Sequence, residues 1–326
     1  MASDSNQSIL SVDIGGTKTA VALVTLSGEI LANEQFPTVV EKGPEDLCDR
    51  LQVSSATLQN TCPTFELIGV GVSAPGPLSS LSGCFLNPPN MPGWHGFPIT
   101  EALSQRIMGI PIELMNDANA AAYAEFKFGA GAGIQTMVFF TMSTGMGAGL
   151  IIGGRLHEGL DDMAGEVGHT LVAQDGPVGF GRRGSLEGFC SGPGIAQLAT
   201  TKLTQAIHEE RDSALLHLDK DWRLVDSMDV GRAAELGDEV AQDCLRESAA
   251  RLGGFCADLV DLLNPERIVL GTIGRMHADL MIPVARAEIN RIAHAKAAER
   301  VQIVPAKLAD SLPCLAGAAA FLARQE

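Results

Sequence analysis

The stretch Ile9–Thr25, ILSVDIGGTKTAVALVT, sets two apolar runs on either side of the glycine pair Gly15-Gly16. Ile9–Ile14 and Thr19–Thr25 both have the length and composition of strands, and Gly-Gly between them is typical of a tight turn. A second turn at Ser27-Gly28 leads into Ile30–Phe36, which predicts a third strand. The beginning of the chain therefore predicts an antiparallel meander of three strands.

The same order begins again in the second half of the chain. Thr136–Met142 and Ala148–Ile152 predict two strands around the glycine-rich turn Thr144–Gly147, and Arg155–His157 predicts a third. Because both halves open alike, we predict a duplicated α/β unit with a cleft between two domains: a small N-terminal domain, 1–117 plus 311–326, and a large domain, 118–310. The remaining segments predict helices at 44–60, 118–128 and 317–323 and from about 194, 230 and 238, and strands at 67–73, 112–115, 267–270 and 301–304.

The length and the net charge of the chain limit the partners that it can have. The 326 residues suit two domains of about 150 residues each. Lys and Arg number 23 against 39 Asp and Glu, a net charge of −16. That charge repels phosphate backbones and anionic lipid, so we expect neither a nucleic-acid nor a membrane partner.

The beginning of the sequence and its cysteines bear on the compartment. MASDSNQS lacks the basic and apolar regions of a signal peptide, and the seven cysteines are scattered without a CxxC pair. The uncharged stretch 128–154 is rich in glycine and predicts strands around a turn rather than a membrane span. We therefore expect a cytoplasmic protein with reduced thiols.

Two glycine turns are candidate phosphate-binding segments. In Asp13–Lys18 a strand ends on a carboxylate, and the glycines let backbone N–H groups approach an anion closely. Thr17 adds a hydroxyl, and Asp13 can hold Mg²⁺ directly or through its waters. An ordinary hairpin turn explains the same residues, but Ser143–Gly149 repeats the arrangement, and two facing turns would hold a polyphosphate from both sides. Ser143–Gly149 is neither a Walker A loop nor a dinucleotide fingerprint, because no Gly-Lys-Ser/Thr follows and the next segment predicts a strand.

Polar residues elsewhere suit a hydroxylated ligand. Asp117 lies between the end of a predicted strand and the start of a predicted helix. It is therefore either the N-cap of that helix or a general base at the edge of the sheet where ligands bind. Glu166 and His169, three residues apart, share a face if the segment is helical or tightly turned, and Glu187 follows a glycine-rich loop. For such a pair alone, a surface Glu and a satisfied His are the ordinary explanation. A glycosidase would also need two carboxylates, but not two phosphate-type turns.

Together, Asp13–Lys18, Asn116–Asn119, Thr144–His169 and Glu187 resemble the ROK family of sugar kinases and sugar-responsive repressors. The similarity covers nearly the whole chain. It includes Gly71–Pro77 and Pro89–Trp94. It implies a duplicated ribonuclease H-like fold, that of sugar kinases, Hsp70 and actin, and a homodimer.

The resemblance also implies roles for individual residues. Asp117 would be the catalytic base, and the sugar hydroxyls would bind Asn116, Glu166, His169 and Glu187, with Asn90 and Gly76 lining the same pocket. ATP would contact both glycine turns, and adenosine the region after a late strand, where the family usually has glycine in place of Thr272. The expected ATP and Mg²⁺ residues are Asp13 (also the Mg²⁺ residue), Gly15, Gly16, Thr17, Lys18, Thr144, Gly145, Gly147, Gly271 and Thr272.

The implied activity is ATP-dependent phosphorylation of a hexose, with glucose as the default substrate. N-acetylmannosamine, N-acetylglucosamine and fructose kinases share the same polar residues. A repressor would need a helix-turn-helix segment before the first strand, for which eight residues leave no room, and the charge opposes DNA binding. A non-catalytic, sugar-binding or sugar-responsive relative is the remaining alternative, against which the intact Asp117 argues.

One loop departs from the family pattern. Most ROK proteins bind zinc through the motif histidine and three cysteines of a C-x-C-G-x-x-G-C loop, but here Val178, Phe180 and Ser185 stand at the three cysteine positions. These side chains cannot replace thiolates, so we expect no structural zinc, with Phe180 packed where the metal would sit. Arg182-Arg183 in the same loop is most simply a solvated pair.

Overall fold

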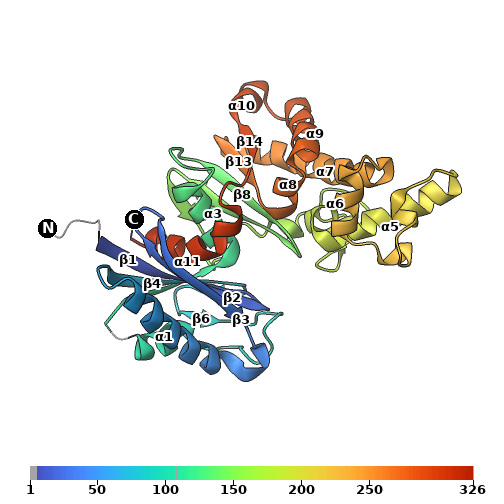
Figure 1. Cartoon of the computed structure of the whole chain (residues 1–326). Coiled ribbons are helices and arrows are strands. Elements are labelled where there is room, and N and C mark those ends of the chain that lie inside the picture. The colour runs from blue at the N-terminus through green and yellow to red at the C-terminus, as the bar shows by residue number, and fades with distance from the viewer. Residues whose placement is uncertain (1–5, 108, 326) are drawn as a thin grey trace. The chain divides into compact units, whose positions relative to one another are not determined.

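The computed structural model describes residues 6–107 and 109–325 and divides the chain into two units (Figure 1). Unit 1 comprises Met1–Gly133, Gly149–Ala164 and Lys307–Glu326, and unit 2 comprises Ile134–Ala148 and Gly165–Ala306. The domain boundaries inferred above, 1–117 plus 311–326 and 118–310, stay a prediction. No helix in the described part of the chain is long and apolar enough to cross a bilayer.

The sheet of unit 1 has the strand order β3-β2-β1-β4-β7. The strands β1, β2 and β3 pair antiparallel, which confirms the predicted meander, while β4 and β7 run parallel to β1. β1 and β2 are almost wholly buried, as is usual for strands with helices on both faces. The bounds are β1 Gln7–Ile14, β2 Lys18–Thr25, β3 Ile30–Pro37, β4 Glu66–Ala74 and β7 Ile112–Asn116, with a small hairpin of β5 (Leu78–Ser79) and β6 (Cys84–Phe85).

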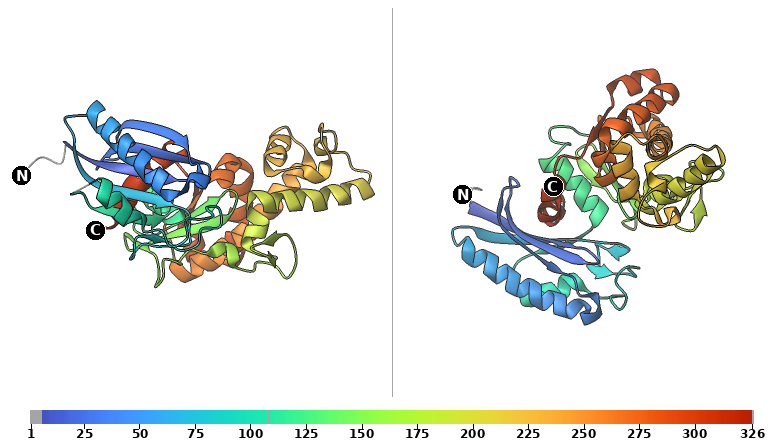
Figure 2. Two further views of the ribbon diagram at one scale, coloured as in Figure 1. Left: turned by 90° about the horizontal axis from the view of Figure 1, so that it is seen from below. Right: turned by 45° about the vertical axis from the view of Figure 1, so that its right-hand side comes forward.

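Helices cover both faces of this sheet. The helix α1 (Gly43–Thr61), which has a proline in its first turn as predicted, lies on one face, and α11 (Leu312–Ala323) lies on the other (Figure 2, right). The helix α2 (Ile99–Arg106) packs on α1, and α3 (Asp117–Phe128) packs on α11.

The last helix approaches the sheet unusually closely. A Cβ atom on Gly71 of β4 would lie 1.8 Å from the carbonyl oxygen of Gly317 in α11. The N–H of Ala318 also donates to the buried Oγ of Ser11 in β1, at 2.9 Å. Only glycine at both positions permits this contact between the sheet and α11.

The second sheet has the order β10-β9-β8-β13-β14, the same succession of first to fifth strands as in the first sheet. This repetition confirms the predicted duplication. β9 begins at Met146, so Met146 and Gly147 belong to a strand and the predicted turn is shorter than expected. The bounds are β8 Met137–Met142, β9 Met146–Ile152, β10 Arg155–His157, β13 Arg267–Leu270 and β14 Gln302–Pro305.

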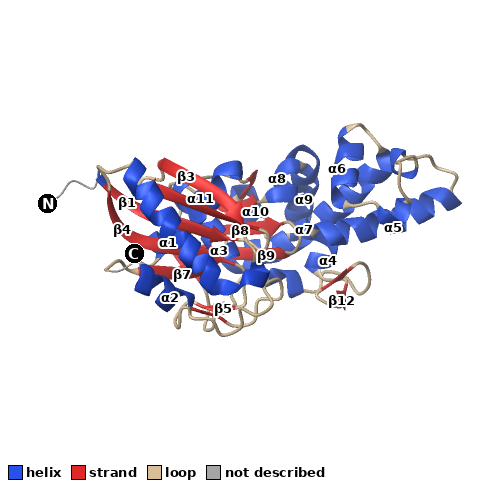
Figure 3. Ribbon diagram, turned by 60° about the horizontal axis from the view of Figure 1, so that its bottom comes forward, coloured by secondary structure: helices blue, strands red, loops and turns tan. Residues whose placement is uncertain are grey.

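The helices of unit 2 gather around α7 (Glu239–Leu263), which packs against α4, α5, α6 and α9 (Figure 3). Gly253 in α7 lies directly under α9, where a Cβ atom would be 2.7 Å from the Cα atom of Ala285. The helices predicted from about 194, 230 and 238 are confirmed, whereas α2, α4, α8, α9 and α10 were not predicted. The bounds are α4 Leu186–Cys190, α5 Gly192–His208, α6 Ser227–Glu235, α8 Thr272–Met276, α9 Ala278–Ile292 and α10 Ala295–Arg300.

The neighbouring glycines of α7 offer a matched test of this packing. Gly253→Ala should lower the free energy of unfolding by about 1–3 kcal/mol, because the new methyl group meets the backbone of α9. Gly254→Ala should raise it by about 0.5–1 kcal/mol, since the nearest atom, in Ile292, is 3.9 Å away and alanine favours a helix. Urea unfolding of both variants measures the difference, and equal effects would contradict the close approach of α9.

Candidate functional site

The carboxyl ends of three parallel strands form one edge of the sheet in unit 1. In the strand register Asp13 lies beside Ser73, and Ala74 beside Asn116. The hydroxyl of Ser73 donates to Oδ1 of Asp13 at 2.7 Å. Residues far apart in the sequence thus meet at the edge where α/β folds commonly bind ligands.

The carboxyl group of Asp13 lies in a poorly solvated position. Burial raises the pKa of Asp13 from 3.8 to about 6, against the opposing effects of the Ser73 hydrogen bond and the Lys18 charge. A cation beside this carboxylate would offset its loss of hydration. The carboxylate of Asp13 therefore suits a hard divalent cation such as Mg²⁺, which prefers oxygen ligands.

Asn116 and Asp117 begin α3. Asn116 is the N-cap, since its Oδ1 accepts the N–H of Ala118 at 2.9 Å. Asp117 occupies the first helical position, and its Oδ1 accepts the same N–H at 2.8 Å, while its side chain is exposed. The capping role considered for Asp117 thus falls chiefly to Asn116. Gly76 lies close by, because a Cβ atom there would be 3.0 Å from Nδ2 of Asn116.

The first glycine turn lies beside Asn90. The N–H of Gly15 donates to the carbonyl of Lys18 at 2.9 Å and closes the turn, while Thr17 and Lys18 are exposed. A Cβ atom on Gly16 would lie 3.7 Å from Asn90. Trp94, four residues further along, is fully buried, and its Nε1 donates to the carbonyl of Val40 at 3.2 Å.

In unit 2, the carboxylate of Glu187, one of the residues expected to bind sugar, lies against the second glycine turn. Its Oε2 accepts the N–H of Met146 at 3.1 Å, and a Cβ atom on Gly145 would lie 3.0 Å from the same oxygen. Partial burial raises the pKa of the Glu187 carboxyl, which the hydrogen bonds from Met146 and Phe180 counteract.

Glu166 and His169 lie on one side of a tight turn, as one of the two sequence interpretations predicts. Val167–His169 forms a 3-10 helix, and Nε2 of His169 is 3.8 Å from Oε2 of Glu166. The ring of Phe180 stacks on the imidazole of His169, with centroids 3.9 Å apart and planes inclined by 18°.

The loop around Phe180 does not offer zinc ligands. Of the four positions that carry them in the family, only His169 has a side chain that binds zinc well. Ser185 Oγ is already occupied as the N-cap of α4, since it accepts the N–H of Gly188 at 3.1 Å and donates to the carbonyl of Gly179 at 3.2 Å. This donor set does not fit a tetrahedral zinc site.

A cavity of about 370 Å³ in unit 2 brings Thr144 and Thr272 together. Both residues were expected to contact ATP, although they lie 128 positions apart in the sequence. The N-terminus of α5 opens onto the cavity, where a helix dipole favours an anion. At the N-terminus of α6, the carboxylate of Asp226 already accepts the N–H groups of Met228 and Asp229. Side chains such as Met228 and Ile273 supply apolar wall. Ser143, from the glycine-rich segment singled out in the sequence, also lies in the wall. Sequence reasoning missed the rest of the wall, because no local motif marks these residues: Gly192, Pro193, Ala196, Asp226, Ser227, Met228, Ile273, Met276 and His277.

Gly271 supports the position of Thr272 without lining this cavity. It is the N-cap residue of α8, and its N–H donates to the carbonyl of Phe140 at 2.8 Å. A Cβ atom on Gly271 would lie 2.7 Å from that carbonyl oxygen, so glycine keeps α8 close to β8.

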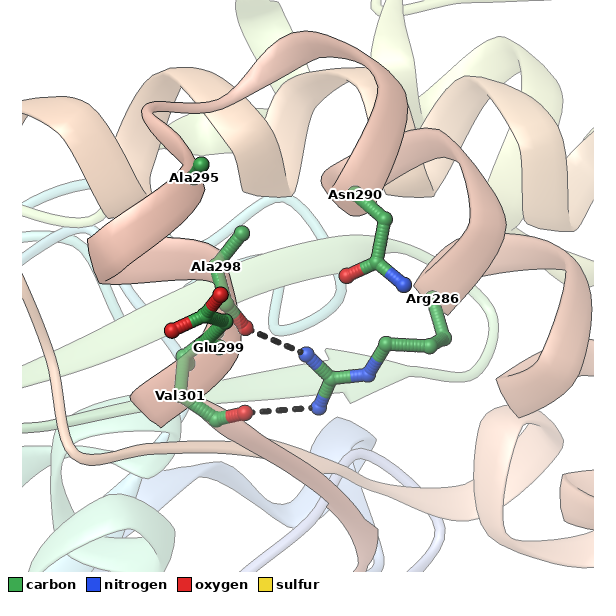
Figure 4. A pocket seen from close by; sticks show the side chains of 6 residues that line it. All are labelled: Arg286, Asn290, Ala295, Ala298, Glu299 and Val301. Carbon is green, nitrogen blue, oxygen red and sulfur yellow. Dashed lines mark hydrogen bonds between the residues drawn. The ribbon is translucent and has the colours of Figure 1, made fainter.

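A second cavity, of about 460 Å³, contains none of the predicted residues. Arg286 lies in its wall and donates to the carbonyls of Ala298 at 3.2 Å and Val301 at 2.7 Å (Figure 4). Because these main-chain carbonyls engage the guanidinium group, Arg286 joins α9 to the C-terminal end of α10 instead of offering a ligand site.

The sequence-predicted residues fall into two groups. Unit 1 holds Asp13, Gly15, Gly16, Thr17, Lys18, Gly76, Asn90, Asn116 and Asp117, and unit 2 holds Thr144, Gly145, Gly147, Glu166, His169, Glu187, Gly271 and Thr272. Within each unit, residues expected to bind sugar adjoin residues expected to bind phosphate: Asn90 adjoins Gly16, and Glu187 adjoins Gly145.

Comparisons with known proteins agree with this geometry. A glucokinase of Halalkalibacterium halodurans is 35% identical over 266 residues, 80% of this chain and 78% of the relative. An N-acetylmannosamine kinase of Shigella flexneri is 36% identical over 264 residues, 81% of this chain and 82% of the relative. The crystal structure of a ROK glucokinase from Streptomyces griseus, in complex with glucose and AMPPNP, superposes with a TM-score of 0.76 at 32% identity and covers 98% of this chain and 100% of its own.

The same likeness confirms the duplicated fold shared by sugar kinases, Hsp70 and actin, which the order of strands in the two sheets already indicates. Residues 9–326 match the ROK family as a whole. The chain therefore belongs to the ROK family.

Proposed function

We propose that this chain transfers the γ-phosphoryl group of ATP to a hydroxyl of glucose, giving glucose 6-phosphate, with Asp117 as the general base. The chain is a sugar kinase, since it is a ROK protein whose glucokinase and N-acetylmannosamine kinase relatives match most of its length. The observation that supports Asp117 most is its exposed carboxylate directly after β7, beside Asn116 and Gly76.

Phosphoryl transfer asks mainly for positioning and charge neutralisation. Asp117 would accept the proton of the attacking hydroxyl while the polar side chains of the site hold the other hydroxyls. The N–H of Ala118 donates to Oδ1 of Asp117 at 2.8 Å, which orients the carboxylate at the start of α3. The glycine turns would hold the phosphates through backbone N–H groups.

Asp13 would hold Mg²⁺, directly or through water, since its poorly hydrated carboxylate gains from a cation. Bound Mg²⁺ would neutralise phosphate charge as it develops. The Ser73 hydrogen bond keeps one carboxylate oxygen of Asp13 in place, which orients the other.

N-acetylmannosamine is the second candidate substrate, because a relative bearing that kinase name is as similar to this chain as the glucokinase is. N-acetylglucosamine and fructose follow, since the same polar residues serve them. These sugars differ from glucose chiefly at C2 and in ring form, so a panel of sugars separates them.

The first experiment measures ADP release with Mg·ATP against glucose, N-acetylmannosamine, N-acetylglucosamine and fructose. We expect the highest kcat/KM with glucose. Asp117→Asn should lower kcat by about 10²–10⁴-fold, the usual contribution of a general base, and change sugar affinity less than about threefold. Asp219→Asn, which removes an exposed carboxylate elsewhere, is the matched control and should keep wild-type kinetics.

Turnover by Asp117→Asn above about a tenth of the wild-type rate would exclude Asp117 as the base. A wild-type chain that turns over no sugar, yet melts at a higher temperature with one, would instead be a sugar-binding protein without catalysis.

The cavity that contains Thr144 and Thr272 allows a separate test of the nucleotide site. Ala196→Phe places a ring in that cavity and should raise the KM for ATP by about tenfold or more, with the KM for sugar unchanged. Thr201→Phe, on an exposed part of the same helix, should alter neither constant. An unchanged KM for ATP in Ala196→Phe would place the nucleotide elsewhere.

A further inference from the structure

Phe180 occupies a backbone position that its side chain does not favour. It lies in the turn between β11 (Val178–Gly179) and β12 (Arg182–Arg183), with φ at +48°, and Gly181 follows with φ at +70°. A two-residue turn with both φ angles positive is a type I′ hairpin turn, for which Asn-Gly is the preferred sequence. A bulky side chain there is uncommon, so the turn itself does not explain the phenylalanine.

The contacts of Phe180 reach two of the residues expected to bind sugar. Its ring stacks on the imidazole of His169 at 3.9 Å, and its backbone N–H donates to the carboxylate of Glu187. The next strand adds a third contact, because Nη1 of Arg182 donates to the carbonyl of His169 at 3.0 Å. The hairpin lies beside α4, which carries Glu187 (Figure 3).

Phe180 is not a core residue, since 54% of it remains exposed. Burial of apolar area therefore explains little of its presence. Stacking engages only the face of the imidazole, whereas the two ring nitrogens lie in the ring plane and keep their hydrogen-bonding capacity.

We propose that Phe180 is a positioning residue for the sugar site, holding the plane of the His169 imidazole by stacking and the carboxylate of Glu187 by its N–H. This inference rests on the proposed function, in which both side chains bind sugar hydroxyls. In this chain the aromatic contact takes the place of the zinc that the family pattern would put on the same histidine. The observation that points to this replacement of zinc by an aromatic ring is that the side chains of the loop do not fit a zinc site.

The decisive variant is Phe180→Asn, because it removes the ring and creates the preferred Asn-Gly turn. The hairpin should therefore stay folded, with an unchanged or higher melting temperature. We expect the KM for the sugar substrate to rise by about threefold to tenfold, which corresponds to the free energy of an aromatic stacking contact. The KM for ATP should stay unchanged. Phe180→Tyr keeps the stacking face and should stay within about twofold of wild type.

Calorimetric titration of glucose and N-acetylmannosamine into the same variants, without nucleotide, gives a readout independent of turnover. Weaker binding by Phe180→Asn, restored in Phe180→Tyr, supports the proposal even if Asp117 proves not to be the base. Equal sugar affinity in wild type and Phe180→Asn would overturn it while leaving the kinase function intact. A full equivalent of zinc in the purified chain, with sugar affinity lost on chelation, would also overturn it. A wild-type chain that neither binds nor phosphorylates a hexose would refute both proposals.

Discussion

Parallel pairing of β1, β4 and β7 is the constraint on which the site in unit 1 depends. The register sets Asp13 beside Ser73 and Ala74 beside Asn116, so that side chains more than 100 positions apart share one edge. A slip of one residue would turn each of these side chains to the opposite face of the sheet. The buried apolar residues of the strands therefore determine where the chemical groups lie, although none of them takes part in chemistry.

Much of this arrangement is predictable from sequence, because its signals are local. Strand-length apolar runs around Gly15-Gly16 predict the meander, and the second glycine turn predicts its repetition in the other sheet. The helices α2, α4, α8, α9 and α10 were not predicted, since each is short or depends on tertiary packing more than on its own sequence. Much of the wall of the cavity around Thr144 and Thr272 was missed for a related reason: helices from three parts of the chain contribute to it.

The loop near His169 shows the same limit on a smaller scale. The sequence alone reveals that thiolates are missing and that an aromatic side chain stands at one of their positions. It does not reveal the positive φ of Phe180, the ring geometry against His169 or the N–H contact to Glu187. Two chemically unrelated contacts, metal coordination and aromatic stacking, thus serve as alternative ways to orient one histidine.

The close contact of α11 with the sheet also affects the order in which the chain can fold on the ribosome. The helix follows every residue of unit 2 in the sequence, yet it covers the face of β1 and β4 at Gly71. All of unit 2 is therefore synthesised while one apolar face of the first sheet still lacks its cover. A nascent chain at that stage exposes apolar surface of the kind that chaperones bind, and only the packing of α11 onto the sheet removes that surface from solvent.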